Sequence, residues 1–218
     1  MNVLHRTALL ASFLLGACSG LRQEPVTDDA LMAHLTESQR EQIDAARAEH
    51  DHRSDDLAQA RQDVERAKAQ QQLAKTDLSV AEARVDAAES AVAVAATGTT
   101  DEMTEAREAL VVAEAKVVPH RDLIHWRECD VTRAEKAALL AEREEELALA
   151  RVGLEKARAF SKSDRASAAD VDVPKHEARV RECQRLSALA RVELDAAARE
   201  CNVAEKSYDA AQVVSTKD

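Results

Sequence analysis

A long stretch without glycine or proline most constrains how this chain folds. From Asp28 to Ala96 neither residue occurs, and apolar side chains recur at alternating spacings of three and four. This heptad pattern predicts one long helix, 28–96, with a single apolar seam. Thr27 and Asp28 offer N-cap oxygens at its start. One seam position carries large residues and the other carries alanine: Ile43, Leu57, Val64, Leu78, Val85 and Val92, against Ala46, Ala60, Ala67, Ala74, Ala81, Ala88 and Ala95.

The next stretch, 101–160, repeats this pattern after a turn signal at 97–100. Its seam positions are Met103, Leu110, Val117, Ile124, Val131, Ala138 and Val152, with Ala106, Ala113, Ala134, Ala141 and Ala148. If the chain doubles back at Thr99, residues whose numbers sum to 198 face each other, and nearly every layer pairs a large residue with an alanine. This places Arg53 opposite Glu145 and Gln71 opposite Arg127. The sequence therefore predicts an antiparallel coiled-coil hairpin over 28–160.

A third helix, 175–213, is expected after a polar loop at 161–174. A second apolar stripe on 101–160 is the expected contact surface for this third helix. If the chain folds back about Ser167, three pairs face each other: Leu140 and Leu194, Leu154 and Val180, and Trp126 and Tyr208. The fold class is all-α, a long hairpin with a third helix packing back on it. The hairpin beyond the third helix, from about Ser79 to Pro119, is expected to stay bare, with a kink or short break near Val118 because Pro119 lacks a backbone donor.

Composition excludes several classes. Four Gly, three Pro and 2% aromatic residues leave too little turn chemistry and bulk for β or α/β domains. The 41 acidic against 30 basic residues give a net charge of −11, which repels nucleic acid. No nucleic-acid partner is expected.

The N-terminus reads as a secretory signal. A basic start with Arg6 leads into an uncharged apolar run that is too short to span a bilayer. The tetrapeptide Leu15-Gly16-Ala17-Cys18 that follows resembles the lipobox of bacterial lipoproteins. The resemblance implies removal of a signal peptide, 1–17, acyl chains such as palmitate on Cys18 and a lipidated tether, 18–27. Ser19 after the cysteine implies sorting to the outer membrane, facing the periplasm.

Three further cysteines would lie in an oxidising compartment. Cys183 and Cys201 are about 27 Å apart along one helix and cannot bridge each other. Cys129 and Cys201 come within about one turn in the register about Ser167. A disulfide between these two, an intermolecular bond, or free thiols are the alternatives.

Nothing in the chain indicates catalysis, a cofactor or a small-molecule substrate. His125 and Cys129 share a helix face, but two ligands do not complete a metal site, so no metal is expected. His120-Arg121-Asp122-Leu123 mimics a kinase catalytic loop without the other kinase motifs. The protein is predicted not to be an enzyme.

Two roles suit such a chain. The first is a lipid-anchored spacer or assembly scaffold, with a protein partner or self-association through its helices. The second is a docking module in which the hairpin tip binds a partner helical bundle; that tip is similar to the α-hairpins of efflux adaptor proteins, whose lipoyl and β-barrel domains are missing here. The tip residues are Ala95, Thr97, Gly98, Thr99 and Met103. Braun-type lipoproteins, which are coiled coils, attach to peptidoglycan through a terminal lysine, but Lys217 is penultimate, which disfavours that route.

Overall fold

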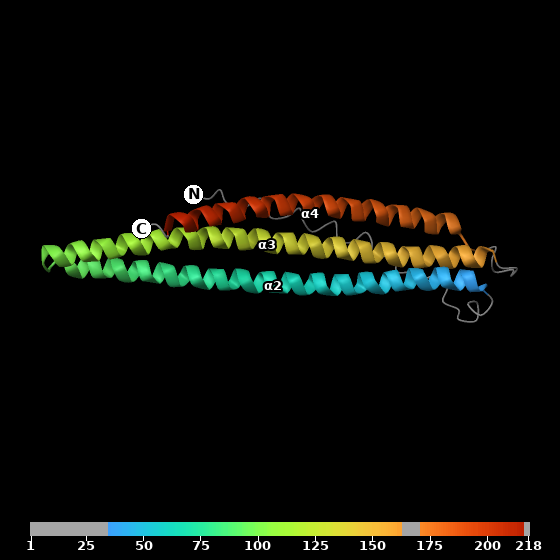
Figure 1. Cartoon of the computed structure of the whole chain (residues 1–218), viewed down its shortest axis with the longest axis horizontal. Helices are drawn as coiled ribbons and strands as arrows, with labels where there is room; N and C mark the ends of the chain where they lie inside the picture. Colours follow the sequence, from blue (N-terminus) through green and yellow to red (C-terminus); the bar gives the residue numbers. More distant parts are fainter. Residues whose placement is uncertain (1–34, 163–170, 216–218) are drawn as a thin grey trace, which may run out of the picture.

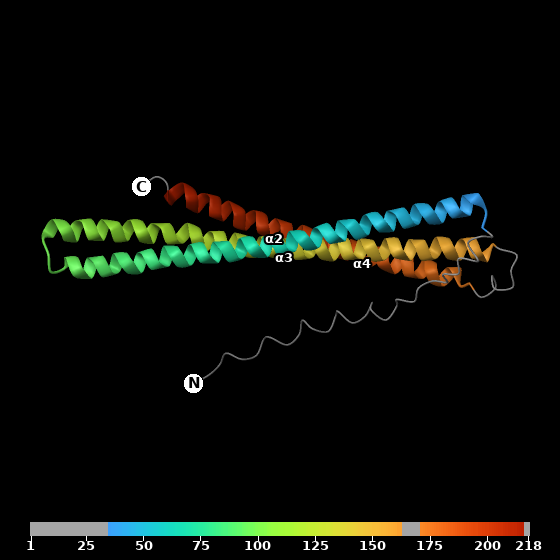
Figure 2. The ribbon, with the colours of Figure 1, turned by 90° about the horizontal axis from the view of Figure 1, so that it is seen from below.

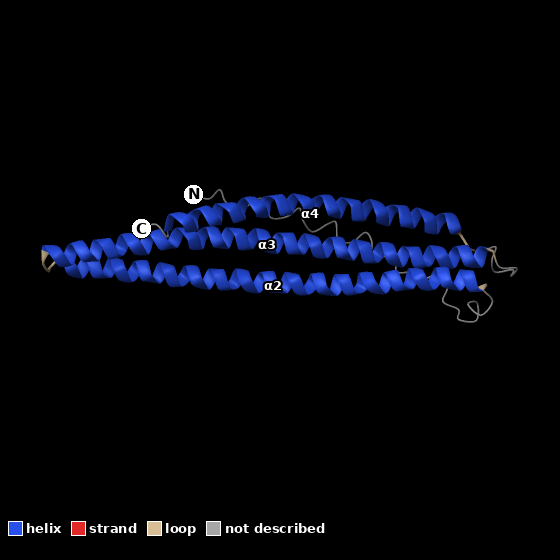
Figure 3. Cartoon of the chain, viewed as in Figure 1, coloured by secondary structure: helices blue, strands red, loops and turns tan. Residues whose placement is uncertain are grey.

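The computed structural model of the chain describes residues 35–162 and 171–215. These residues form three long helices, α2 (Glu37–Ala95), α3 (Thr100–Ser161) and α4 (Val173–Ser215). Figure 3 shows that all the regular structure in the described ranges is helical. The predicted fold class is confirmed: α2 and α3 form an antiparallel hairpin, and α4 packs back along α3 (Figure 1).

Burial along α2 follows the predicted seam. Every buried side chain of this helix occupies one of the two seam positions: Ile43, Leu57, Val64, Ala67, Ala74 and Ala81. The alanines are among the most enclosed, with Ala74 only 2% exposed. The small residues therefore stabilise the hairpin by allowing close approach of the two backbones, since no large apolar cluster is available.

The register about Thr99 is also reproduced. The Gln39 side-chain amide donates to the Ala159 carbonyl oxygen at 3.3 Å, and these residue numbers sum to 198. Arg53 pairs with Glu144 at 3.3 Å, one residue from the predicted Glu145. At mid-length, the Arg127 guanidinium donates to the Gln70 side-chain oxygen at 3.0 Å, one residue from the predicted partner Gln71.

The interface between α3 and α4 follows the second stripe. The rings of Trp126 and Tyr208 stack with centroids 5.4 Å apart, as the fold about Ser167 predicts. Near the other end, Leu154 and Val180 lie in one buried cluster with Ala150. Helix α3 therefore has two apolar faces, one against α2 and one against α4.

The three helices are arranged in sequence order, with α3 in the middle. Helix α3 contacts both neighbours, whereas α2 and α4 have almost no contact with each other. Figures 1 and 2 both show α4 ending before the hairpin turn, so that α2 and α3 continue alone to the left. We call the two-helix part, residues 79–119, the tip, and the opposite end, where α2 and α4 begin and α3 ends, the base.

Two local features differ from the sequence interpretation. Helix α2 begins at Glu37, not at Asp28, because Thr36 caps it: the Thr36 hydroxyl accepts from the Gln39 backbone N–H, and the Gln39 side chain accepts from the Thr36 N–H. The expected break near Val118 is wrong, since α3 continues through Pro119 without interruption. Val117, two residues earlier, is buried in the seam, so packing holds the helix where the backbone hydrogen bond is lost.

The close approach of α2 and α3 gives a stability prediction. Replacing Ala74 by Leu should lower the free energy of unfolding by about 1–3 kcal/mol, because the added atoms have no space at this enclosed position. Urea unfolding followed by circular dichroism measures the change. The control is Ala69→Leu, on an exposed face of the same helix; equal stability of the two variants would contradict the close-packed seam.

Candidate functional site

The tip is closed by a tightly hydrogen-bonded turn. Helix α3 starts with Thr99 as its N-cap, whose hydroxyl accepts from the Glu102 backbone N–H at 3.3 Å. The Glu102 carboxylate accepts in return from the Thr99 N–H at 2.7 Å and from its hydroxyl at 3.0 Å. These contacts lower the pKa of Glu102, with the backbone hydrogen bond as the main cause. The start of α3 is therefore capped by reciprocal hydrogen bonds between Thr99 and Glu102.

Gly98 completes this turn. A Cβ atom added there would lie 2.3 Å from a carboxylate oxygen of Glu102. The missing side chain leaves the space that the capping carboxylate occupies. Of the other tip residues proposed from sequence, Thr97 donates its hydroxyl to the Val94 carbonyl oxygen at 3.0 Å, and Ala95 and Met103 are half-buried in the seam.

The tip has a thin core and an apolar exterior. Between Ala81 and Val117 every side chain is at least partly exposed, because no third helix covers this part of the hairpin. Several valines here point away from the seam, and Val94 is 74% exposed. The others with large exposure are Val80, Val111, Val112 and Val118. Sequence reasoning that followed only the seam positions missed these valines; Val80 and Val94 lie at heptad spacing from Leu73 on an outer stripe of α2, which was a readable signal.

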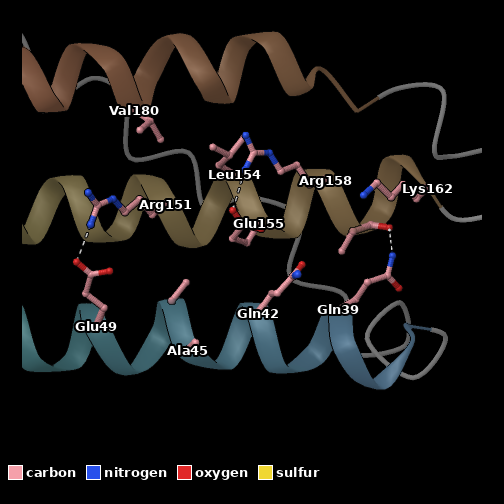
Figure 4. Close-up of a pocket in the computed structure, with 12 residues that line it drawn as sticks. Gln39, Gln42, Ala45, Glu49, Arg151, Leu154, Glu155, Arg158, Lys162 and Val180 are labelled. Carbon is pink, nitrogen blue, oxygen red and sulfur yellow. Dashed lines mark hydrogen bonds and ion pairs between the residues drawn. The ribbon is translucent and has the colours of Figure 1, made fainter.

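An open groove of about 800 Å³ lies at the base (Figure 4). Most of its charged side chains form ion pairs. Arg151 binds Glu49 at 2.6 Å, and Arg158 binds Glu155 at 3.0 Å and Glu177 at 3.2 Å. These pairs join α2, α3 and α4 at the base, and the Lys162 side chain also lines the groove.

The cysteines are placed as the register requires. Cys201 is buried, and burial is the main reason for its raised pKa; nearby Cys129 also raises it, while Arg133 lowers it. Burial likewise raises the pKa of Cys129. Both are free thiols here, on facing helices. The disulfide stays a prediction. Cys183 packs against the apolar cluster around Leu154.

The proposed lipidation site cannot be placed in this structure. Cys18 and the whole signal segment lie outside the described residues. In the ranges 35–162 and 171–215, no cluster of three or more His, Cys, Asp or Glu side chains could hold a metal ion. No helix of those ranges combines the length and the apolarity needed to cross a bilayer.

Comparison with known proteins gives no match: no family model, no curated protein and no solved structure corresponds to this chain.

The cap at the tip predicts a pH effect. Because folding lowers the pKa of Glu102, its contribution to the turn is present above the ordinary carboxyl pKa and is lost as the pH falls through the lowered value. NMR titration should show the Thr99 amide signal moving with a midpoint below that of an unperturbed glutamate. In Glu102→Gln this movement should vanish. An ordinary midpoint, or movement that persists in the variant, would contradict the cap.

Proposed function

We propose that the chain is a non-enzymatic, lipid-anchored protein of the bacterial envelope that acts as a spacer or assembly scaffold. The observation that carries the proposal is the rod itself. Helices α2 and α3 have 59 and 62 residues, which corresponds to a length of about 90 Å at 1.5 Å per residue. Two interfaces along α3 hold the rod together, so it can keep two attachment points at a fixed separation.

The anchor is proposed from the lipobox-like tetrapeptide Leu15-Gly16-Ala17-Cys18. Acyl chains on Cys18 would hold the protein in a membrane, since each buried methylene contributes about 0.8 kcal/mol. Ser19 suggests the outer membrane, with the protein facing the periplasm. The rod starts at Glu37, so such an anchor would sit on the side of the base.

The proposal of a non-catalytic role is supported by how the charged residues are used. At the base, Arg151 of α3 pairs with Glu49 of α2 (Figure 4), and Arg158 of α3 pairs with Glu177 of α4. Many others pair with residues three positions away on the same helix surface, as Arg66 does with Asp63 at 2.8 Å and Arg185 with Glu182 at 2.7 Å. Charges used in this way serve solubility and helix stability instead of substrate binding.

The exposed valines favour a second candidate function, docking through the tip. An apolar exterior at the end of a bare helical hairpin suits the surface of a partner helical bundle. Val94 and Val111 are 74% and 63% exposed, on α2 and α3 respectively. In this reading the base is anchored and the tip binds the partner.

Membrane attachment is tested with one substitution and one matched control. In cells fed radioactive palmitate, the chain should be labelled and should sediment with membranes, whereas Cys18→Ala should lose both properties. Cys183→Ala, which removes a cysteine within α4, should retain both. Continued labelling of Cys18→Ala would rule out this anchor.

Photo-crosslinking separates the two roles. The docking role predicts that a photoreactive residue at Val94 captures one dominant protein, while the same residue at Ala69 does not. Both positions are exposed on α2, but only Val94 lies in the tip. The spacer role predicts scattered adducts at both positions.

A further inference from the structure

The base carries a local excess of positive charge in an otherwise acidic protein. Residues 151–185, which comprise the end of α3, the start of α4 and the loop between them, contain nine Lys and Arg against six Asp and Glu, a net charge of +3. The rest of the chain contains 21 basic and 35 acidic residues, a net charge of −14. Because salt screens exposed charges separated by more than about 10 Å, a partner at the base meets the local excess instead of the charge of the whole rod.

The glutamates in the described part of this region already have cationic partners. Glu155 and Glu177 both bind Arg158, at 3.0 Å and 3.2 Å. Glu182 binds Arg185 at 2.7 Å. These acidic groups and their partners are therefore neutralised locally.

Four cations in the same region have no such partner. Their side chains form no ion pair or hydrogen bond with any other residue in the described ranges, and all are exposed except Arg179, which is half-buried. They are Lys162 at the end of α3, and Lys175, Arg179 and Arg181 in the first turns of α4. The Asp172 carboxylate accepts from the Lys175 backbone N–H at 3.0 Å, which leaves the Lys175 ammonium free. We call these four residues the basic surface.

The electrostatic environment at the start of α4 confirms the local excess. Burial is the main cause of the lowered pKa of His176. The charges of Arg179 and Lys175 lower this pKa further, and Asp172 opposes them. Helices α2 and α4 both begin at the base, so the partial positive charges of two helix N-termini lie there, against one C-terminus from α3.

The basic surface is not bordered by exposed apolar side chains. In the described residues from 151 to 185 no large apolar side chain is exposed, and those nearest in sequence are Leu149 and Leu189. Protein interfaces place polar residues around an apolar core, which is missing at the base. Cations on long side chains without such a core suit a surface of phosphate charges that can rearrange around them.

We propose that the basic surface binds the anionic headgroups of a phospholipid membrane. The contact is one-sided. The acidic residues Glu37 and Glu41 lie at the start of α2, and Figures 1 and 2 place α2 and α4 on opposite sides of α3 at the base. The rod therefore turns the α4 side of its base toward the lipid.

This contact rests on the proposed envelope function only for its location in the cell. Acyl chains on Cys18 would bring the base to a membrane, because the tether enters the rod at Glu37. The basic surface then determines which side of the base faces that membrane. Attraction to anionic headgroups is a property of the described residues and does not need the acyl chains.

The number of free cations sets the expected strength. A Lys or Arg near an anionic membrane strengthens binding about fivefold at physiological salt. Four such residues give a gain of a few hundredfold at most, and the acidic remainder of the chain lowers it. Binding to anionic vesicles on the order of 100-fold stronger than binding to neutral vesicles is therefore expected at low salt.

Vesicle binding tests the basic surface in the full chain carrying Cys18→Ala. Sedimentation with vesicles of equal parts phosphatidylglycerol and phosphatidylcholine is compared with sedimentation with pure phosphatidylcholine vesicles. The ratio of the two binding constants should be on the order of 100 at low salt and should fall to within about threefold of one in about 0.5 M salt. The apolar run near the N-terminus is the same in every variant, so differences between variants report the substituted cations alone.

Two substitutions locate the contact. K175Q/R179Q should lower the ratio about 25-fold, because two cations are removed. K175R/R179K should keep the ratio within about threefold of the parent, because the charges are retained. The matched control is R107Q/K116Q, which removes two exposed cations of the tip and should change the ratio less than about twofold. Circular dichroism checks that each variant keeps the helical fold.

A parent ratio near one, or equal losses in K175Q/R179Q and in R107Q/K116Q, would overturn the proposal. Binding of a short DNA duplex that is tighter than vesicle binding at the same salt would also overturn it, by assigning the cations to nucleic acid. The measurement uses no acyl chain, so its failure would leave the proposed anchor standing. Failure of the palmitate experiment would likewise leave the basic surface standing.

Discussion

Close approach of α2 and α3 through alanine is the constraint on which the rest of the structure depends. The chain has few large apolar residues and cannot form a thick core. Alanines in the seam instead let the backbones of α2 and α3 lie close together, and Ile, Leu and Val side chains fill the space between them. Ala74, Ala81 and Ala148, 2%, 5% and 1% exposed, are enclosed in this seam. Dispersion contacts over the length of the seam then replace the bulk that aromatic residues would supply.

Helix α3 shows how a third helix adds stability to such a hairpin. Toward the base it is covered on two sides, and nearly every side chain from Ala148 to Phe160 is at least partly buried. Toward the tip it is covered on one side and burial stops at Val117. Stability is therefore graded along the rod, with a firm base and a tip whose hydrogen bonds are more exposed to water. The cap formed by Thr99 and Glu102 stabilises the end where packing is weakest.

Sequence periodicity predicted the helices and both registers, because heptad phase determines which residues can face each other. The stacking of Trp126 on Tyr208 follows from that phase alone. Boundaries were predicted less well. The start of α2 depends on which of several residues caps the helix. The sequence interpretation chose Asp28 and overlooked the capping box formed by Thr36 and Gln39. The break expected near Val118 is absent: α3 continues through Pro119, and Val117 stays buried in the seam beside the one lost hydrogen bond. The tip was predicted as a docking surface from its turn and seam residues, but outward-facing valines such as Val94 were not singled out.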